Sequence, residues 1–210
     1  RYPNTDKKIL NSINISIDQN SSIGIIGESG SGKSTLVDIF LGLLTPQQGE
    51  ILIDSKNIKS NLKNWQTNIG YVPQFVFLSD DSIESNIAFG VSKNNINKNK
   101  ILECLEMAQL SEFVKNLPDG LETLIGEHGA RLSGGQRQRI GIARSLYNNP
   151  NILVFDEATS SLDNKTEKNF IEVVRQLQKD KTIIIVSHRL TSVKYCDKIL
   201  KIENGNVYEE

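Results

Sequence analysis

Apolar residues follow two different periods in the first fifty positions of the chain. At residues 13–17 isoleucines alternate with polar residues, which predicts a strand, and the apolar run at residues 23–26 predicts a second strand that leads into a glycine-rich loop. From residue 33 to residue 44 the apolar positions recur at helical spacing, and Pro46 and Gly49 follow. We therefore expect a helix directly after the loop, closed before Pro46.

The middle of the chain differs in character from its flanks. Residues 51–53 and 69–72 have the composition of short strands, whereas residues 97–110 show helical periodicity behind Asn97, a residue type that caps helices. The stretch from residue 74 to residue 147 is predicted to be mainly helical.

Strand and helix patterns alternate again after Pro150. Residues 152–155 form a short apolar run typical of a buried strand, residues 166–178 are predicted to be a helix, and residues 182–186 form a second apolar run. The pair Asn204-Gly205 lies between two further apolar segments and predicts a hairpin turn. Together the patterns predict an α/β fold, in which helices flank a mixed sheet and a helical segment is inserted midway.

Composition excludes some classes of partner. The 210 residues suffice for one α/β domain, and 38% hydrophobic residues with a net charge of −1 describe an ordinary polar surface. The chain lacks the excess of Lys and Arg that binding to nucleic acids or anionic membranes requires, so we expect no nucleic-acid partner. The two cysteines, Cys104 and Cys196, have no metal-ligand spacing and are predicted to be buried thiols in a reducing compartment.

The sequence has no targeting or membrane-spanning signal. No apolar run approaches the roughly 18 to 20 residues that cross a bilayer, and no signal peptide is recognisable. The chain begins at Arg1 without an initiating Met, so we expect it to be part of a longer protein.

The strongest chemical signal is a P-loop pattern between the strand at residues 23–26 and the helix that follows. Its residues are Gly27, Glu28, Ser29, Gly30, Ser31, Gly32, Lys33 and Ser34. Glycines let backbone N–H groups turn toward phosphate oxygens, and Lys33 neutralises their charge. Ser34 is predicted to ligate Mg²⁺ and Thr35 to bind a neighbouring phosphate. The alternative is a flexible Gly/Ser loop that merely opens a helix.

Two carboxylates at the end of the strand at residues 152–155 form a second candidate site. Asp156 is placed to hold Mg²⁺, and Glu157 is placed to polarise the attacking water, as in a Walker B segment. Two solvated acids between a strand and a turn are the alternative interpretation.

A third motif separates this chain from kinases, GTPases and motor ATPases. Leu132 is followed by Ser133, Gly134, Gly135 and Gln136, and then by a basic amphipathic stretch. Taken alone, the motif is an N-cap with a flexible entry, which presents N–H groups and a positive dipole end to an anion. With this pentapeptide the chain resembles the ABC ATPase family, whose signature motif it is. In that family Ser133 to Gln136 would close over the γ-phosphate held by a second copy.

Further family landmarks occur in order along the chain. Tyr2 matches the aromatic residue that stacks on adenine, although a residue so near the end of the chain can instead fray. Gln74 matches the glutamine that meets the metal and the attacking water, with an ordinary loop Gln as the alternative. Asp163, at the end of the segment 160–163, matches a loop that crosses between subunits, against a helix cap. His188 matches the histidine that contacts the γ-phosphate, although a lone His is more often structural.

The resemblance implies fold, ligands and partners. It implies a RecA-like P-loop NTPase fold with a mixed sheet, a core of residues 1–76 and 148–210, and an inserted helical subdomain of residues 77–147. ATP and Mg²⁺ are the implied cofactors, with Glu157, His188 and Gln74 as the catalytic residues. The implied partners are a second copy in a head-to-tail homodimer and a transmembrane domain on the same full-length chain, at the cytoplasmic face of a bacterial inner membrane.

Residues 123–129 resemble the loop by which exporter-type ABC proteins contact their membrane domains. His128 departs from this pattern, because exporters most often have Arg there. With Trp65 four residues before the segment 69–74, the chain resembles flippases of lipid-linked oligosaccharides and other glycolipid exporters. Burial in the core is the alternative explanation of this Trp. The resemblance thus implies an ATPase domain of an exporter, with a peptide, protein or drug exporter as the alternative. A non-transport ABC ATPase is less consistent with the sequence, because no coiled coil separates Gln74 from Ser133.

Overall fold

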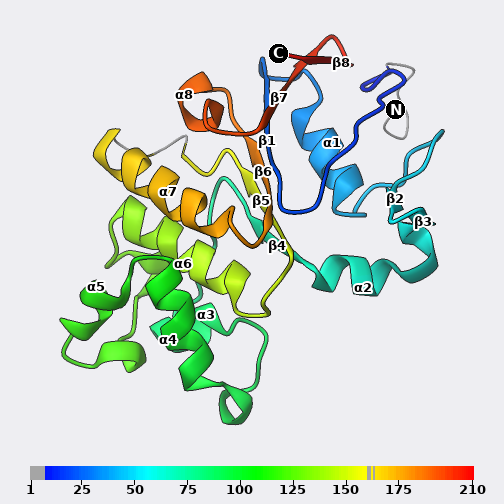
Figure 1. The fold of residues 1–210 in the computed structure, drawn as a ribbon. Coiled ribbons are helices and arrows are strands. Elements are labelled where there is room, and N and C mark those ends of the chain that lie inside the picture. Colours follow the sequence, from blue (N-terminus) through cyan, green and yellow to red (C-terminus); the bar gives the residue numbers. More distant parts are fainter. Residues whose placement is uncertain (1–7, 160–161, 163) are drawn as a thin grey trace.

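A six-stranded sheet forms the centre of the molecule (Figure 1). The computed structural model describes residues 8–159, 162 and 164–210. The strand order is β4-β5-β6-β1-β7-β8, and every pairing is parallel except that of β7 with β8. The strands are β1 (Ser22–Gly27), β4 (Ile69–Val72), β5 (Ile152–Asp156), β6 (Thr182–Val186), β7 (Lys198–Glu203) and β8 (Asn206–Glu209). A separate antiparallel pair consists of β2 (Leu52–Ile53) and β3 (Lys56–Asn57). The predicted α/β class with a mixed sheet is confirmed.

Helices cover the sheet and form a group at one end of the molecule. The helices are α1 (Lys33–Phe40), α2 (Leu62–Thr67), α3 (Ile83–Ile87), α4 (Lys98–Met107), α5 (Ser111–Lys115), α6 (Gly134–Leu146), α7 (Asn164–Leu177) and α8 (Leu190–Val193). Short 3₁₀ turns of the described ranges lie at Ile58–Asn61, Lys93–Asn95, Gly120–Glu122 and Glu127–Gly129. Helices α3 to α6 lie together below the sheet in Figure 1, with α3 and α4 packed on α6. The boundaries 77 and 147 of a helical subdomain stay a prediction.

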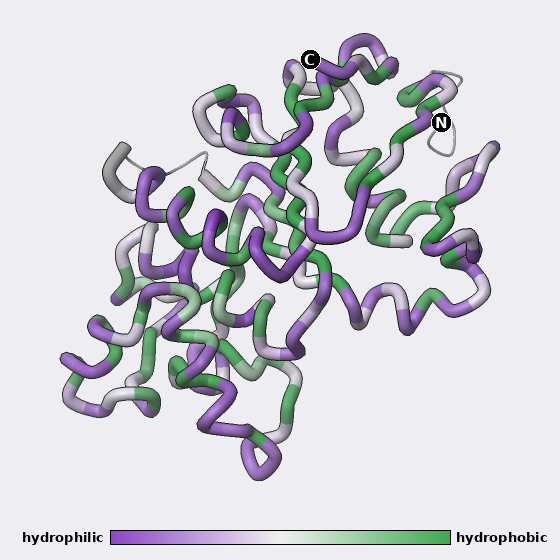
Figure 2. The backbone as a smooth tube through the Cα atoms, in the orientation of Figure 1, coloured by the Kyte–Doolittle hydropathy of each residue, from purple (hydrophilic) through white to green (hydrophobic). Residues whose placement is uncertain are grey.

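The central strands are buried on both faces, as the continuous apolar runs predict. In β5, Leu153 and Phe155 pack into a core that includes residues of α6 and α7. Val154, which points to the opposite face, packs with Val37 and Leu41 of the α1 layer. Figure 2 shows the resulting hydrophobic colour along the middle strands.

The first predicted helix ends earlier than its apolar pattern indicates. It stops at Phe40 and not at Leu44, because Gly42 adopts a left-handed conformation with φ of 71°. The N–H of Gly42 donates to the carbonyl of Ile39, and the N–H of Leu43 donates to that of Asp38. This pair of bonds is a Schellman motif, which satisfies the last carbonyls of the helix.

The prediction of a strand at residues 13–17 is wrong, because a strand requires a paired neighbour. The segment belongs to no strand of the described residues, yet its isoleucines are half-buried and alternate with exposed polar residues. Ile15 and Ile17 pack against the core on the α1 face. The alternation therefore reports one-sided burial of an extended segment, and the hydrogen-bonded ladder that defines a strand is a separate requirement.

Two local predictions about helix and turn ends are confirmed. Asn97 caps α4, with its side-chain oxygen accepting from the N–H groups of Asn99 and Lys100. Asn204 and Gly205 both have positive φ, as the tight turn between β7 and β8 requires.

Three further expectations concern single side chains and membrane spans. Trp65 is buried, and its indole N–H donates to the carbonyl of Phe40, so its place in the core explains it. Cys104 is buried and Cys196 is half-buried, both as free thiols. Across the described ranges, no helix combines the length and apolarity needed to traverse a bilayer.

Candidate nucleotide-binding and hydrolysis site

Four neighbouring strands bring the predicted site residues to one edge of the sheet. The register aligns the ends of β4, β5, β6 and β1, so the loops that leave their carboxyl ends emerge side by side. The P-loop follows β1, Asp156 ends β5, His188 follows β6 and Gln74 follows β4. In open α/β sheets this edge is where ligands bind.

The P-loop has the backbone conformation that its glycines permit. Gly30 and Gly32 have φ values of 78° and 111°, which a residue with a side chain adopts only with strain. A Cβ on Gly30 would meet nothing within 4 Å, so this part of the loop faces open space. Gly32 is the N-cap of α1, and the helix N-terminus adds a positive dipole end beside the loop.

The polar atoms of the loop fit a bound phosphate chain. Lys33 is buried, and its ammonium group donates to the carbonyls of Gly27 and Glu28 at 2.8 Å and 2.9 Å. These are neutral acceptors, and among the described residues no carboxylate lies within ion-pair distance of Lys33. The hydroxyl of Ser31 is buried and has no hydrogen-bond partner there. A buried cation and an unsatisfied donor beside a positive helix end suit an anionic ligand.

Asp156 lies in a partly buried position that disfavours its charge. Burial raises the pKa of its carboxyl group above the ordinary value, and the nearby charges of Glu157 and Asp38 raise it further. The phenol of Tyr71 donates to Asp156 at 3.1 Å, which opposes the shift. A divalent cation here would relieve the same penalty, because it supplies the opposite charge.

No sequence motif indicated the contact of Tyr71 with Asp156. The alternation of side chains along neighbouring strands could have indicated it. Tyr71 aligns with Val154 in the parallel pair of β4 and β5, and Asp156 lies two residues after Val154. All three side chains therefore point to the same face of the sheet, because alternate residues of a strand share a face.

Glu157, Gln74 and His188 come together from three different loops. The amide nitrogen of Gln74 donates to Oε2 of Glu157 at 3.1 Å, and Nδ1 of His188 lies 3.8 Å from the same oxygen. Glu157 itself has a φ of 49°, a left-handed conformation that is strained for a non-glycine residue. Its N–H donates to the carbonyl of Val186 at 2.9 Å, which ties this turn to the end of β6.

The predicted magnesium ligands have suitable chemistry. Ser34 is exposed in the first turn of α1, and Gln74 and Asp156 lie at the ends of neighbouring strands. A hydroxyl, an amide oxygen and a carboxylate are hard oxygen donors of the kind that Mg²⁺ takes together with phosphate oxygens and water. The part of the chain that the structure describes has no cluster of three or more His, Cys, Asp or Glu side chains able to hold a metal without such a ligand.

The signature motif forms the N-terminus of α6. Ser133 caps this helix, and Ser133 and Gln136 form a capping box in which each side chain accepts from the other's backbone N–H. Gly134 is exposed, and Gly135 approaches α7 so closely that an added Cβ would lie 2.6 Å from Cγ2 of Thr166. Within the described ranges, the side chain of Ser133 hydrogen-bonds at its own helix end.

Two of the predicted site residues fall outside the described part of the chain. These are Tyr2, the predicted adenine contact, and Asp163, at the end of the segment predicted to cross between subunits. Thr35, the remaining P-loop residue, is half-buried in α1.

A family model described as ABC transporter matches residues 10–160. The chain is 40% identical over 209 residues to the ATP-dependent lipid A-core flippase of Idiomarina loihiensis, which covers 99% of this chain and 36% of the flippase. It is 43% identical over 211 residues to the Toxin RTX-I translocation ATP-binding protein of Actinobacillus pleuropneumoniae, covering 100% of this chain and 30% of that protein.

A solved structure of a bacterial Atm1-family ABC exporter with ATP bound superposes on the chain with a TM-score of 0.88 at 35% identity. The superposition covers 99% of this chain and 36% of the exporter, so the chain spans about a third of the length of these relatives. The match of fold, P-loop and signature motif leads to one conclusion. The chain belongs to the ABC transporter family, as an ATP-binding domain of the type that its exporters carry.

Proposed function

We propose that the chain binds Mg-ATP and hydrolyses it to drive a membrane exporter. The observation that carries the proposal is the convergence of Gln74 and His188 on one carboxylate oxygen of Glu157, at the sheet edge that also holds the P-loop. Catalysis of phosphoryl transfer to water depends mainly on positioning and charge stabilisation, and these groups suit both tasks.

Each of these side chains has a role in the proposed reaction. Glu157 accepts a hydrogen bond from the attacking water and receives its proton, while Gln74 and His188 orient the carboxylate and the terminal phosphate. Lys33 neutralises phosphate charge, and the backbone N–H groups of the P-loop hold the oxygens. Mg²⁺, held through Ser34, Gln74 and Asp156, would supply further charge neutralisation to the β- and γ-phosphates.

We further propose that the active form is a head-to-tail pair with ATP at the interface. Ser133, Gly134, Gly135 and Gln136 would face the γ-phosphate bound by the second copy, and Asp163 would cross between the two. Tyr2 would stack on the adenine ring. The proposal is supported by the exposed, capped start of α6, which offers N–H groups and a hydroxyl to an anion.

A membrane domain is the second proposed partner. Large apolar side chains are exposed just after Gln74 and on the neighbouring helical segment: Phe75, Phe77, Phe89 and Leu124. Phe77 also lies edge-to-face with His128 at 5.7 Å, so the loop predicted to contact the membrane domain borders this surface. Exposed apolar patches of this kind mark interaction sites. Docking there would place the domain at the cytoplasmic face of a membrane, in a bacterium the inner one.

The cargo is proposed by comparison. A lipid-linked oligosaccharide or other glycolipid is our first candidate, because a relative that covers 99% of the chain is named a lipid A-core flippase. Protein export is the second candidate, because the relative at 43% identity is named for translocation of a toxin.

The proposal is tested by light scattering after size-exclusion chromatography, combined with phosphate release. Glu157→Gln removes the base and keeps its hydrogen bonds, so we expect this variant to dimerise with Mg-ATP and to release no phosphate. Ser133→Arg is expected to bind ATP but neither to dimerise nor to turn it over. Wild-type protein with no more ATPase activity than Glu157→Gln would contradict the proposed hydrolysis.

A further inference from the structure

A buried carboxylate on α7 lies behind the loop that carries His188. Glu167, in the first turn of α7, has a side chain that is only 9% exposed. Its Oε1 accepts a 2.6 Å hydrogen bond from the hydroxyl of Ser192, and its Oε2 lies 3.3 Å from Nη1 of Arg189. Thr191 donates to Oε1 at 3.4 Å. All three donors come from the segment that directly follows His188.

The same network reaches the turn that carries Glu157. The hydroxyl oxygens of Thr159 and Ser192 lie 3.0 Å apart, and both residues are buried. Since the single proton of Ser192 is donated to Glu167, the hydroxyl of Thr159 is the donor in this contact. The hydrogen bonds therefore run in one direction, from Thr159 through Ser192 to the carboxylate.

The segments that carry Glu157 and His188 contact each other on both the open and the buried side of the hydrolysis site. On the open side, Nδ1 of His188 lies 3.8 Å from Oε2 of Glu157. On the buried side, Thr159 is two residues after Glu157, and Arg189 directly follows His188. The hydroxyl contact of Thr159 with Ser192 joins the segment after Glu157 to the segment after His188. Glu167 holds Ser192 and Arg189 of this second segment from the buried side.

We infer that Glu167 is a positioning residue for ATP hydrolysis, which holds the His188 segment at its working distance from Glu157. The inference rests on the proposed function for its effect on turnover. A buried carboxylate without its donors is costly, so Glu167 draws the hydroxyl of Ser192 and the guanidinium of Arg189 to fixed places. Displacement of a catalytic group by about 1 Å can cost on the order of 100-fold in rate.

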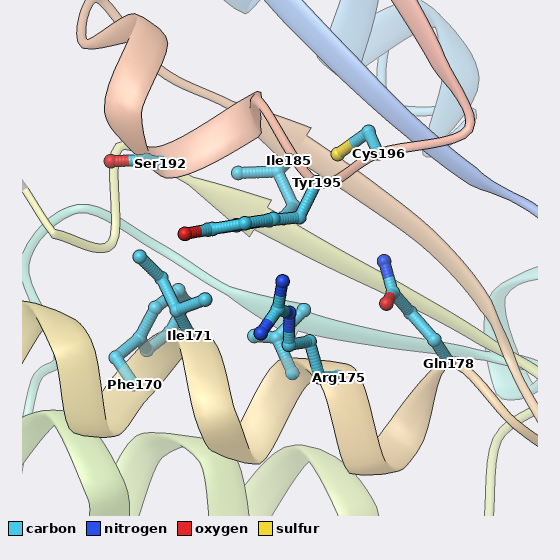
Figure 3. A pocket seen from close by; sticks show the side chains of 9 residues that line it. Phe170, Ile171, Arg175, Gln178, Ile185, Ser192, Tyr195 and Cys196 are labelled. Carbon is cyan, nitrogen blue, oxygen red and sulfur yellow. The ribbon is translucent and has the colours of Figure 1, made fainter.

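A second contact between α7 and α8 lies farther along both elements. Figure 3 shows Tyr195, just after α8, lying over Arg175 of α7, with the guanidinium carbon 3.7 Å from the ring centre. Ser192 and Cys196 line the small pocket beside this stack. Because this contact does not involve Glu167, we expect α8 to stay attached to α7 and only to shift when the carboxylate is removed.

The test compares Glu167→Ala and Glu167→Gln with Glu172→Gln, a control that removes an exposed carboxylate from the same helix. The chain has two histidines, so its histidine-labelled NMR spectrum contains one signal from His188 and one internal reference from His128. We expect Glu167→Ala to shift the His188 signal and to lower kcat about 10- to 100-fold, with KM for ATP within about twofold. The His128 signal should not move.

The conservative variant separates positioning from general stability. Glu167→Gln keeps an oxygen that can accept from Ser192 but loses the charge that faces Arg189, so its kcat and its His188 shift should lie between wild type and Glu167→Ala. Unchanged His188 signals and kcat in both Glu167 variants would overturn the inference. If wild type shows no turnover, the proposed function fails, and the NMR shift alone then decides the inference. If Glu167→Ala does not fold, Glu167→Gln and Ser192→Ala decide it by the same readouts.

Discussion

Arg144 connects the signature helix to the segment that follows Gln74, and its removal is predicted to destabilise the fold. Its guanidinium donates to the carbonyl of Asn86 at 2.7 Å, to the carbonyl of Phe77 at 2.7 Å and to Oδ1 of Asn86 at 3.1 Å. It also lies over the ring of Phe89, at 4.8 Å from the ring centre. Burial lowers the pKa of Arg144, so part of its hydration is lost on folding.

The cost of Arg144→Ala follows from what each acceptor retains. Asn86 is fully buried, so its carbonyl loses its charged donor and water cannot replace it easily, which costs about 1–3 kcal/mol. Oδ1 of Asn86 keeps the N–H of Ser79 at 3.0 Å, and the carbonyl of Phe77 is exposed to water, so both cost little. The lost contact with Phe89 adds about 0.5–1 kcal/mol. We expect a total of about 1.5–4 kcal/mol.

Urea unfolding measures this loss. The chain contains one tryptophan, the buried Trp65, whose fluorescence reports unfolding of a part of the core that Arg144 does not touch. Arg131→Ala is the matched control, because Arg131 is exposed and its guanidinium makes one hydrogen bond within the described residues, of 3.2 Å to the carbonyl of Leu124. We expect this variant to change stability by less than about 0.5 kcal/mol. A loss below about 1 kcal/mol for Arg144→Ala would contradict this prediction, because the carbonyl of Asn86 would then have found another donor.

Three further predictions concern packing, charge and thiol reactivity. Gly135→Ala should lower ATP turnover and stability, because the added Cβ would lie 2.6 Å from Cγ2 of Thr166. Adding Thr166→Ser to the same chain deletes that methyl group and should restore both turnover and stability. If the double variant is not rescued, this clash is excluded as the cause. Burial raises the pKa of Asp156 above 3.8, so the folded state binds its proton more tightly and wild type loses stability as pH rises through the window above 3.8. Asp156→Asn lacks this loss, so its melting temperature relative to wild type should increase from pH 3.5 to pH 7, and a decrease would contradict the assigned shift. Burial raises the pKa of Cys104 to about 11 and that of Cys196 to about 12. Because the thiolate is the reactive form, a thiol reagent at pH 8 should label the folded chain at least about 100-fold more slowly than the chain in urea. Equal rates would show that folding does not protect the thiols.

Local sequence signals predicted most of the regular structure because local interactions determine it. Asn97 caps α4 through bonds to residues two and three positions away, and the turn at Asn204-Gly205 needs only the φ preferences of its own residues. The end of α1 also had a local signal in Gly42, which outweighs the apolar pattern that continues to Leu44.

Pairing of the residues 13–17 could not be predicted, because a strand needs a partner that is distant in sequence. Periodicity reports which side of a segment is buried, and the half-buried isoleucines agree with it. It does not report whether backbone N–H and C=O groups meet a neighbouring strand.

The candidate site divides along the same line. The P-loop, Asp156 and the signature motif each lie within a few consecutive residues, so sequence alone could name them. Tyr71 of β4 contacts Asp156 of the neighbouring strand β5, and Glu167 contacts Ser192, which lies 25 positions later in the chain. Such contacts depend on register and helix packing, which no short motif contains.

Ser133 shows that a structural and a functional interpretation of one residue need not exclude each other. As an N-cap, its hydroxyl accepts a 3.2 Å hydrogen bond from the N–H of Gln136, and its own N–H donates to Oε1 of Gln136 at 2.8 Å. Capping therefore uses an acceptor site of the hydroxyl and leaves its proton to donate elsewhere. The N–H groups of Gly134 and Gly135, in the first turn, have no partner inside the helix. The capping box thus holds the hydroxyl and two N–H groups in a fixed arrangement at the positive end of α6. Such an arrangement would suit contact with the γ-phosphate of ATP that a second copy holds.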